Sequence, residues 1–104
     1  MNKPIILTGN RASGKTTISN LMTRFLSRTE YQRVSILDLS ERLIEENNTK
    51  LKLLIVEDCE TSVKIIRTEH YLNTINHEIQ LVFETNSNIP LNFPGFEVIK
   101  CNHK

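Results

Sequence analysis

The chain has 104 residues, of which 38% are hydrophobic and 24% charged, and its formal net charge is +1. A chain of this length and composition is typical of one globular domain with its own hydrophobic core, so we treat residues 1–104 as a single domain. The balance of 13 basic and 12 acidic residues excludes nucleic-acid binding through bulk positive charge, although local contacts with nucleic acid stay open. Cys59 and Cys101 form no CxxC pair, and no apolar run is long enough for a membrane span or a signal peptide. We therefore expect a cytoplasmic protein with reduced thiols and no membrane partner.

The first half of the chain predicts two strands and two helices. Residues 4–8 form a short apolar run that ends at a glycine, which predicts a buried strand. A helix is expected over 14–27, with one face made of Ile18, Leu21, Met22, Phe25 and Leu26. A second strand is expected at 34–37. Asp38 and Glu41 then have the spacing of a capping box, which predicts a short helix to about residue 46.

The second half predicts three more strands and one more helix. The most apolar run of the chain, residues 51–56, predicts a third strand. A helix is expected over 62–73, with Val63, Ile66 and Tyr71 facing inward. Strands at 79–83 and 96–101 follow, and the prolines between them break any long helix. Strands that alternate with helices in this way predict an α/β fold with a five-stranded parallel sheet and few short helices.

A phosphate-binding motif lies between the first strand and the first helix. Residues 9–16 read Gly-Asn-Arg-Ala-Ser-Gly-Lys-Thr and fit G-x-x-x-x-G-K-[ST], the Walker A loop, at every defined position. Glycine lets the backbone approach phosphates closely, and the N–H groups of the loop and helix start form an anion site. Lys15 is expected to reach the β- and γ-phosphates, and the Thr16 hydroxyl to ligate Mg²⁺. The residues expected to bind ATP or another NTP are Gly9, Asn10, Arg11, Ala12, Ser13, Gly14, Lys15, Thr16 and Thr17.

Two acidic residues, Glu57 and Asp58, end the third strand. This buried strand brings them to the carboxyl edge of the sheet, where open α/β sheets bind their ligands. One carboxylate would hold Mg²⁺ and the next could orient or deprotonate an attacking water, so the expected metal ligands are Thr16, Glu57 and Asp58. The alternative is that the pair only caps the next helix. The presence of the phosphate loop favours the metal site.

The fourth strand ends in Glu84-Thr85-Asn86. An amide at this point could orient water near a γ-phosphate, although asparagine and serine are also ordinary turn formers.

Cysteine, phenylalanine and histidine residues outside these segments give further expectations. Cys59, close to a helix N-terminus, is either a thiol of low pKa or a small packing residue. Phe93 and Phe96 are expected in the core, and His70, His77 and His103 lack the pattern of a metal site.

The three polar segments together resemble the additional-strand P-loop ATPases, the AAA+ class, and the viral superfamily 3 helicases, over nearly the whole chain. The resemblance implies a three-layer P-loop NTPase fold with strand order 5-1-4-3-2. It also implies that Glu57 is the metal-side acid, Asp58 the water-activating acid and Asn86 the residue called sensor 1. On this basis the expected catalytic residues are Lys15, Asp58 and Asn86.

The chain departs from that class in two respects. The usual acidic ending is Asp-Glu, whereas this chain has Glu57-Asp58 with the shorter acid second. No arginine follows Arg67 in the 104 residues, and the helical lid that carries another arginine in the class is missing from this sequence. An arginine finger contributes several kcal/mol to phosphoryl transfer. We therefore expect either that a partner protein or a second copy of the chain supplies it or that turnover is slow. Arg67 is expected to be a solvated helix residue, with donation of its charge to another subunit as the alternative.

Three functions remain open from the sequence. The first is an AAA+- or helicase-like ATPase that binds ATP with Mg²⁺ and hydrolyses it weakly, or only in an assembly. The second is a nucleotide-binding regulatory module with negligible turnover. The third is a small-molecule kinase, which the arginine-free last third of the chain disfavours.

Overall fold

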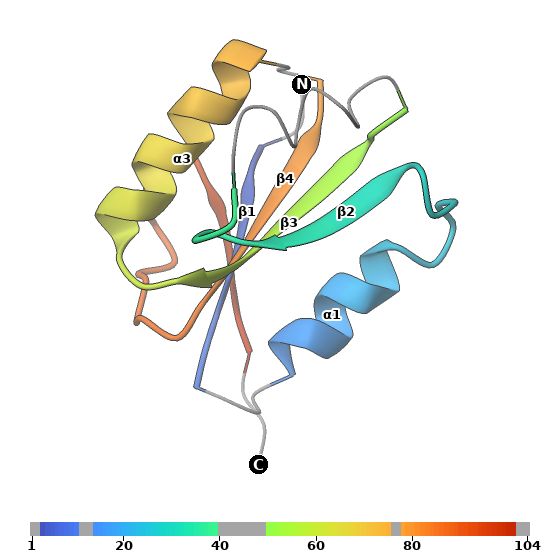
Figure 1. Cartoon of the computed structure of the whole chain (residues 1–104). Coiled ribbons are helices and arrows are strands. Elements are labelled where there is room, and N and C mark those ends of the chain that lie inside the picture. The colour runs from blue at the N-terminus through green and yellow to red at the C-terminus, as the bar shows by residue number, and fades with distance from the viewer. Residues whose placement is uncertain (1–2, 11–13, 40–49, 76–77, 102–104) are drawn as a thin grey trace.

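The computed structural model describes residues 3–10, 14–39, 50–75 and 78–101. Its five strands form one sheet: β1 (Ile5–Thr8), β2 (Tyr31–Ser35), β3 (Leu53–Cys59), β4 (Gln80–Thr85) and β5 (Glu97–Lys100). Helices α1 (Lys15–Met22) and α3 (Ser62–Ile75) lie on opposite sides of this sheet (Figure 1). The expected α/β class with a sheet between helices is therefore confirmed.

The strands are ordered β2-β3-β4-β1-β5, which is 5-1-4-3-2 when read from β5. Every neighbouring pair is parallel. Parallel neighbours require a crossover between them, and the helices and loops provide these connections. The carboxyl ends of all five strands therefore meet at one edge of the sheet, which is where the polar segments of the sequence lie.

Several element bounds differ from those expected. Strand β2 covers 31–35 and not 34–37, because Gln32 and Arg33 pair with β3 although their polar side chains conceal the strand in the sequence. Strand β3 continues to residue 59 through the acidic pair. Strands β1, β4 and β5 shift by one or two residues at their ends. Asp38 lies in a turn, and the rest of the helix expected over 38–46 falls mostly outside the described residues.

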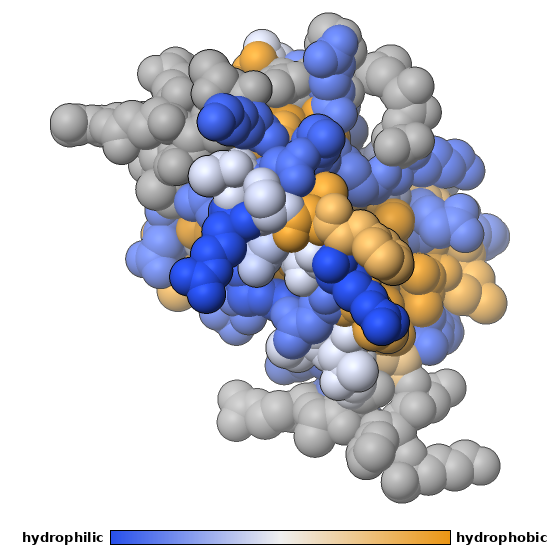
Figure 2. Space-filling view, turned by 90° about the vertical axis from the view of Figure 1, so that its right-hand side faces the viewer, coloured by the Kyte–Doolittle hydropathy of each residue, from blue (hydrophilic) through white to orange (hydrophobic). Residues whose placement is uncertain are grey.

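Helix α1 ends at Met22, five residues earlier than expected. The N–H groups of Thr23 and Arg24 bond to carbonyls three residues back, so the helix closes in a tight turn. Phe25 consequently lies outside the helix and is 91% exposed, with the Arg24 guanidinium 5.9 Å from its ring centre. Figure 2 shows hydrophobic atoms exposed beside strongly hydrophilic ones on the side that carries this turn.

Helix α3 buries the opposite residues to those expected. Val63 and Ile66 are 54% and 46% exposed, and Tyr71 is also exposed. Ile65 and Leu72, seven residues apart and so on one helix face, are buried against the sheet instead. The helix carries aliphatic residues on both sides, so its periodicity alone does not select the inward face.

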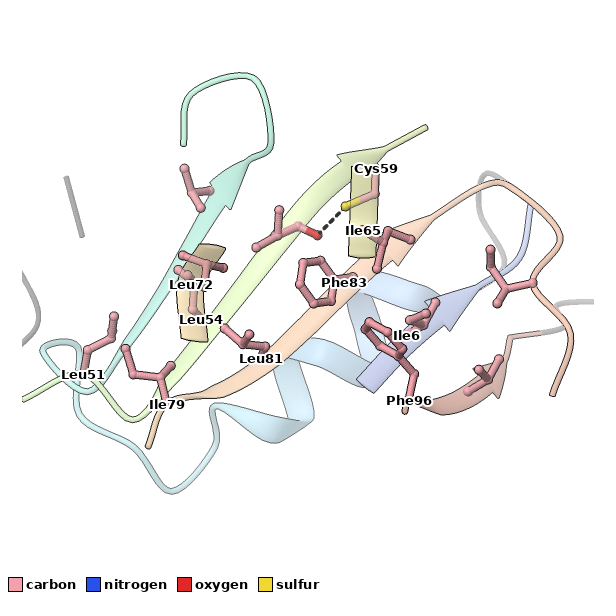
Figure 3. Close-up of a cluster of buried hydrophobic side chains, with 14 residues drawn as sticks. Ile6, Leu51, Leu54, Cys59, Ile65, Leu72, Ile79, Leu81, Phe83 and Phe96 are labelled. Carbon is pink, nitrogen blue, oxygen red and sulfur yellow. Dashed lines mark hydrogen bonds between the residues drawn. The ribbon is translucent and has the colours of Figure 1, made fainter. Parts of the chain in front are cut away.

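The larger part of the core lies between the sheet and α3 (Figure 3). Phe83 is its largest fully buried side chain, and its ring packs edge-on against Phe96 at 6.2 Å. Phe93 packs against Phe96 from the loop before β5, so the two phenylalanines expected in the core are found there. Burial of a large apolar side chain contributes roughly 1.5–3 kcal/mol each, which makes this side the main source of stability.

A smaller cluster lies between the sheet and α1. Its buried members are Leu7, Leu53, Ile55, Val82 and Cys101. Ile18 and Met22 of α1 pack against it, as the sequence predicted for these two residues. Toward the carboxyl ends of β3 and β4, polar side chains replace the apolar ones on this face. No helix within the described ranges is long and apolar enough to cross a membrane.

Candidate functional site

Hydrogen bonds tie the carboxyl ends of four strands together at one edge of the sheet. The N–H of Gly9, just after β1, donates to the Thr85 carbonyl at 3.2 Å. The N–H of Cys101, just after β5, donates to the Thr8 carbonyl at 2.7 Å. The Thr85 hydroxyl donates to the Cys59 carbonyl at 2.5 Å and so joins β4 to β3. The start of the phosphate loop is therefore fixed against three neighbouring strand ends.

The glycine that precedes α1 adopts a conformation that other residues rarely take. Gly14 has φ +94° and stands at the N-cap of the helix. An ideal Cβ added there would meet no atom within 4 Å, so the backbone angle and not the available space requires glycine. This explains why the motif has glycine immediately before its lysine.

Lys15 folds back over the loop it belongs to. Its ammonium donates to the carbonyl oxygens of Gly9 at 2.6 Å and Asn10 at 2.7 Å. The side chain is buried although it carries a charge. Burial of a charge is costly unless it is compensated, and these two carbonyl oxygens compensate the charge of the ammonium. Arg11, Ala12 and Ser13, the other expected loop residues, lie outside the described residues.

The first turn of α1 presents backbone donors and no acid. The N–H of Ile18 makes the first helical bond, to the Gly14 carbonyl at 3.0 Å, so the N–H groups before it have no partner inside the helix. The first turn contains no acidic residue. Thr16 and Thr17 are exposed there. This end of α1 is suited to an anion, since the helix dipole adds positive potential to N–H groups that have no partner inside the helix.

The acidic pair at the end of β3 lies on a β-bulge. Val56 pairs with Phe83 and Cys59 with Thr85, so β3 has one more residue than β4 over this stretch. Asp58 takes up the extra residue with φ +61° and is exposed. Aspartate tolerates this left-handed conformation better than most residues. The bulge returns Cys59 to the core on the α3 side and leaves the carboxylate of Asp58 in solvent.

Glu57 stays on the α1 side of β3, where it is partly buried. Desolvation is the main cause that raises the pKa of its carboxyl above 4.5. The positive charge of Arg33 lowers this pKa, while the negative charges of Glu84 and Asp58 raise it further. Burial is therefore the main reason why the charged form of this carboxyl is disfavoured, and a bound cation would stabilise that charged form.

An ionic network that the sequence analysis missed lies beside this acid. The Arg33 guanidinium, from β2, donates to the Glu84 carboxylate of β4 at 2.8 Å and to the Ser19 hydroxyl of α1 at 2.6 Å. It also donates to the side-chain oxygen of Asn20 at 2.8 Å. The Ser19 hydroxyl lies 2.6 Å from Glu84 as well. The network thus joins the edge strand, the phosphate-loop helix and β4 on one side of the sheet.

The sequence contains a signal for this network. Glu84 interrupts the apolar run 81–83 one residue before β4 ends, and Arg33 lies in a strand that also contains Val34. Charged residues inside buried strands are rare unless they are paired, so one of each sign suggests a contact. The pair was overlooked because the expected second strand began after Arg33.

Asn86 is exposed in the turn after β4. The residues beside it fix that turn: the Ser87 N–H donates to the Thr85 hydroxyl at 3.0 Å, and the Ser87 hydroxyl donates to the Glu60 carbonyl. The Thr8 hydroxyl donates to the Ser87 carbonyl. Asn86 thus stands on a turn that is bonded to the ends of β1 and β3, at the same edge as the phosphate loop.

Thr16, Glu57 and Asp58, the expected metal ligands, carry oxygen donors. In the described part of the chain no three His, Cys, Asp or Glu side chains are grouped closely enough to hold a metal ion. Mg²⁺ needs only one or two protein oxygens when phosphates and water complete its shell. Thr16 and Glu57 offer hard oxygen donors of the right kind, while Asp58 adds a nearby negative charge.

The two interpretations of Cys59 can be compared with the structure. The pKa of the Cys59 thiol is raised to about 12, mainly by burial and then by the charges of Asp58 and Glu84, which argues against the reactive low-pKa thiol. Cys59 is a packing residue, as the alternative held. Arg67 and His70 are exposed on α3, which lies on the opposite side of the sheet from α1. His77 and His103 lie outside the described residues.

A scan against protein-family models gave no match, and a search of curated proteins gave none either.

Proposed function

We propose that the chain binds ATP or another nucleoside triphosphate together with Mg²⁺ at the carboxyl edge of the sheet, and that it hydrolyses the nucleotide weakly unless an assembly completes the site. The observation that carries this proposal is the buried ammonium of Lys15 over the Gly9 and Asn10 carbonyls, at the N-terminus of α1. A cation, the N–H groups of a helix start and a glycine with positive φ in one place suit a polyphosphate.

The roles of the residues follow from their positions. Lys15 and the first N–H groups of α1 would hold the phosphates, with Lys15 redirected from the loop carbonyls toward the β- and γ-oxygens. Thr16 and Glu57 would hold Mg²⁺, which neutralises phosphate charge and orients the γ-phosphoryl group. Asp58, exposed next to Glu57, would accept a proton from the attacking water, which the amide of Asn86 helps to orient.

Weak turnover in the isolated chain is part of the proposal. Of the arginines in the described part of the chain, Arg33 lies near this edge, and Glu84, Ser19 and Asn20 already accept hydrogen bonds from it. Its charge is therefore committed to the protein and does not serve as an arginine finger. A partner protein or a second copy, whose Arg67 is one candidate donor, would supply that charge. A regulatory module that binds nucleotide without turnover is the limiting case of the same arrangement.

The binding proposal is tested by calorimetry with ATP and Mg²⁺. Lys15→Ala should weaken ATP binding by about 100-fold or more, because it removes the buried cation that faces the phosphates. Lys64→Ala is the matched control, since Lys64 is an exposed lysine on α3. Equal ATP affinity of Lys15→Ala and the parent protein would overturn the assignment of the phosphate site.

The hydrolysis proposal is tested by measuring phosphate release as protein concentration rises, with and without single-stranded DNA. Turnover per subunit should increase with concentration or with DNA if an assembly completes the site. Asp58→Asn should retain ATP binding and lose this turnover. Unchanged turnover in Asp58→Asn would assign the base to another residue, and binding with no turnover under any condition would select the regulatory module.

A further inference from the structure

Arg33 is a fixed positive charge at the acidic end of β3. Its guanidinium is held by Glu84 at 2.8 Å, by Ser19 at 2.6 Å and by Asn20 at 2.8 Å. The carboxylate of Glu84 is itself only 6% exposed and the Arg33 side chain 24% exposed. With acceptors from both a strand and a helix, the guanidinium cannot turn away without leaving Glu84 buried and unpaired.

The same guanidinium lies close to the proposed metal-side acid. Its Nη1 atom is 3.7 Å from the carboxylate of Glu57, which is beyond hydrogen-bond distance but close enough for a strong Coulomb attraction. Arg33 therefore partly neutralises Glu57 from a position that the network fixes. Salt screens an interaction in a partly buried place less than at the open surface.

The positive charge of Arg33 at this distance opposes the binding of a metal cation to Glu57. A free divalent ion would gain from Glu57 and lose by repulsion from Arg33. An ion that arrives with a nucleotide brings several negative phosphate charges, which outweigh one guanidinium. The geometry thus favours binding of the metal ion only when it is bound to the phosphates of a nucleotide.

This inference rests on the proposed function of the site. We propose that Arg33 is a positioning residue whose fixed charge keeps free divalent cations off Glu57, so that Mg²⁺ enters the site only as part of a metal–nucleotide complex. Nucleotide and metal binding are then coupled by electrostatics that is built into the sheet, with Glu84 and Ser19 as the groups that hold Arg33 in place.

The test measures Mn²⁺ binding to the nucleotide-free protein by calorimetry and by the loss of the free-ion EPR signal. The key variant is Arg33→Gln with Glu84→Gln, which removes both charges and keeps polar groups able to bond to Ser19. It should bind Mn²⁺ about tenfold more tightly than the parent protein, because Arg33 acts on Glu57 more strongly than Glu84 does. If this pair does not fold, Arg33→Met with Glu84→Leu replaces it with the same expectation, since apolar replacement of a buried ion pair is often tolerated.

Three controls separate charge from structure. Arg33→Lys keeps a positive charge and should leave Mn²⁺ affinity close to that of the parent. Glu84→Gln alone keeps Arg33 and should not raise the affinity. Glu30→Gln with Lys52→Gln removes an exposed ion pair of 2.7 Å elsewhere, and should also leave the affinity unchanged.

The outcomes distinguish the inference from the proposed function. Mn²⁺ affinity in the charge-free pair no higher than in the parent protein overturns the role of Arg33. The role of Arg33 is also overturned if the parent protein binds Mn²⁺ as tightly without ATP as with it. If the parent binds no ATP at all, the proposed function fails and this inference fails with it. If ATP binds normally and only the Arg33 variants show no effect, the inference alone fails.

Discussion

The two sides of the sheet differ in what they bury. The α3 side holds Phe83, Phe96 and most of the apolar core. The α1 side begins with a smaller apolar cluster and ends in Arg33, Glu84 and Glu57. Because the α3 side supplies most of the hydrophobic stabilisation, the α1 side can carry buried charges at the strand ends. Variants on each side should therefore fail in different ways.

The largest effect is expected from a cavity on the α3 side. Phe83→Ala should lower the free energy of unfolding by about 3–5 kcal/mol, because Phe83 is fully buried and its loss leaves a void between the sheet and α3. Urea unfolding measures this change. Calorimetry at a temperature where the variant is still folded should show ATP affinity close to that of the parent. A loss below about 1 kcal/mol would mean that the α3 side does not carry the fold.

A smaller but still clear effect is expected from the ionic network on the α1 side. Arg33→Met should lower the free energy of unfolding by about 2 kcal/mol, because it leaves Glu84 buried without its charged partner. Adding Glu84→Leu should restore most of this stability, since no buried charge then remains. Urea unfolding of the two single variants and the double variant forms the cycle. If the double variant is less stable than Arg33→Met, the two residues do not act as a pair.

The smallest effect is a gain in stability at Glu57. Its pKa is raised above 4.5 in the folded protein, so the folded state binds a proton more readily and loses stability as the pH rises through that window. Glu57→Gln should therefore raise Tm slightly at pH 7, and the gain should vanish at about pH 3, where the carboxyl is protonated in both states. Thermal melts at the two pH values measure this change. Glu97→Gln, at an exposed position of β5, is the control. A lower Tm for Glu57→Gln at pH 7 would contradict the stated cause of the shift.

Most of the fold could be predicted because its signals are local. Each strand except β2 has a short apolar run, and the glycine of the phosphate loop marks where β1 gives way to α1. The inward face of α3 could not be predicted, because Val63 and Ile66 are as apolar as Ile65 and Leu72. Only the sheet, which is assembled from distant segments, selects between the two faces.

The candidate site was predictable in the same uneven way. The loop and the acids of β3 were found because a motif or a strand end marks each of them. The contact between Arg33 and Glu84 joins residues 51 positions apart, and it depends on β2 and β4 lying on either side of β3. The bulge that leaves Asp58 exposed is also absent from any sequence pattern, because it arises from the register between β3 and β4.

The place of β1 in the sheet has a mechanical consequence. Four residues of β1 pair with β4 on one side and with β5 on the other, and the phosphate loop follows directly at Gly9. Tension applied to the loop along β1 would load both ladders in shear, so their hydrogen bonds would share the force and not open one after another. Any movement that a bound nucleotide produces there would reach the neighbouring strands as a pull on the whole sheet.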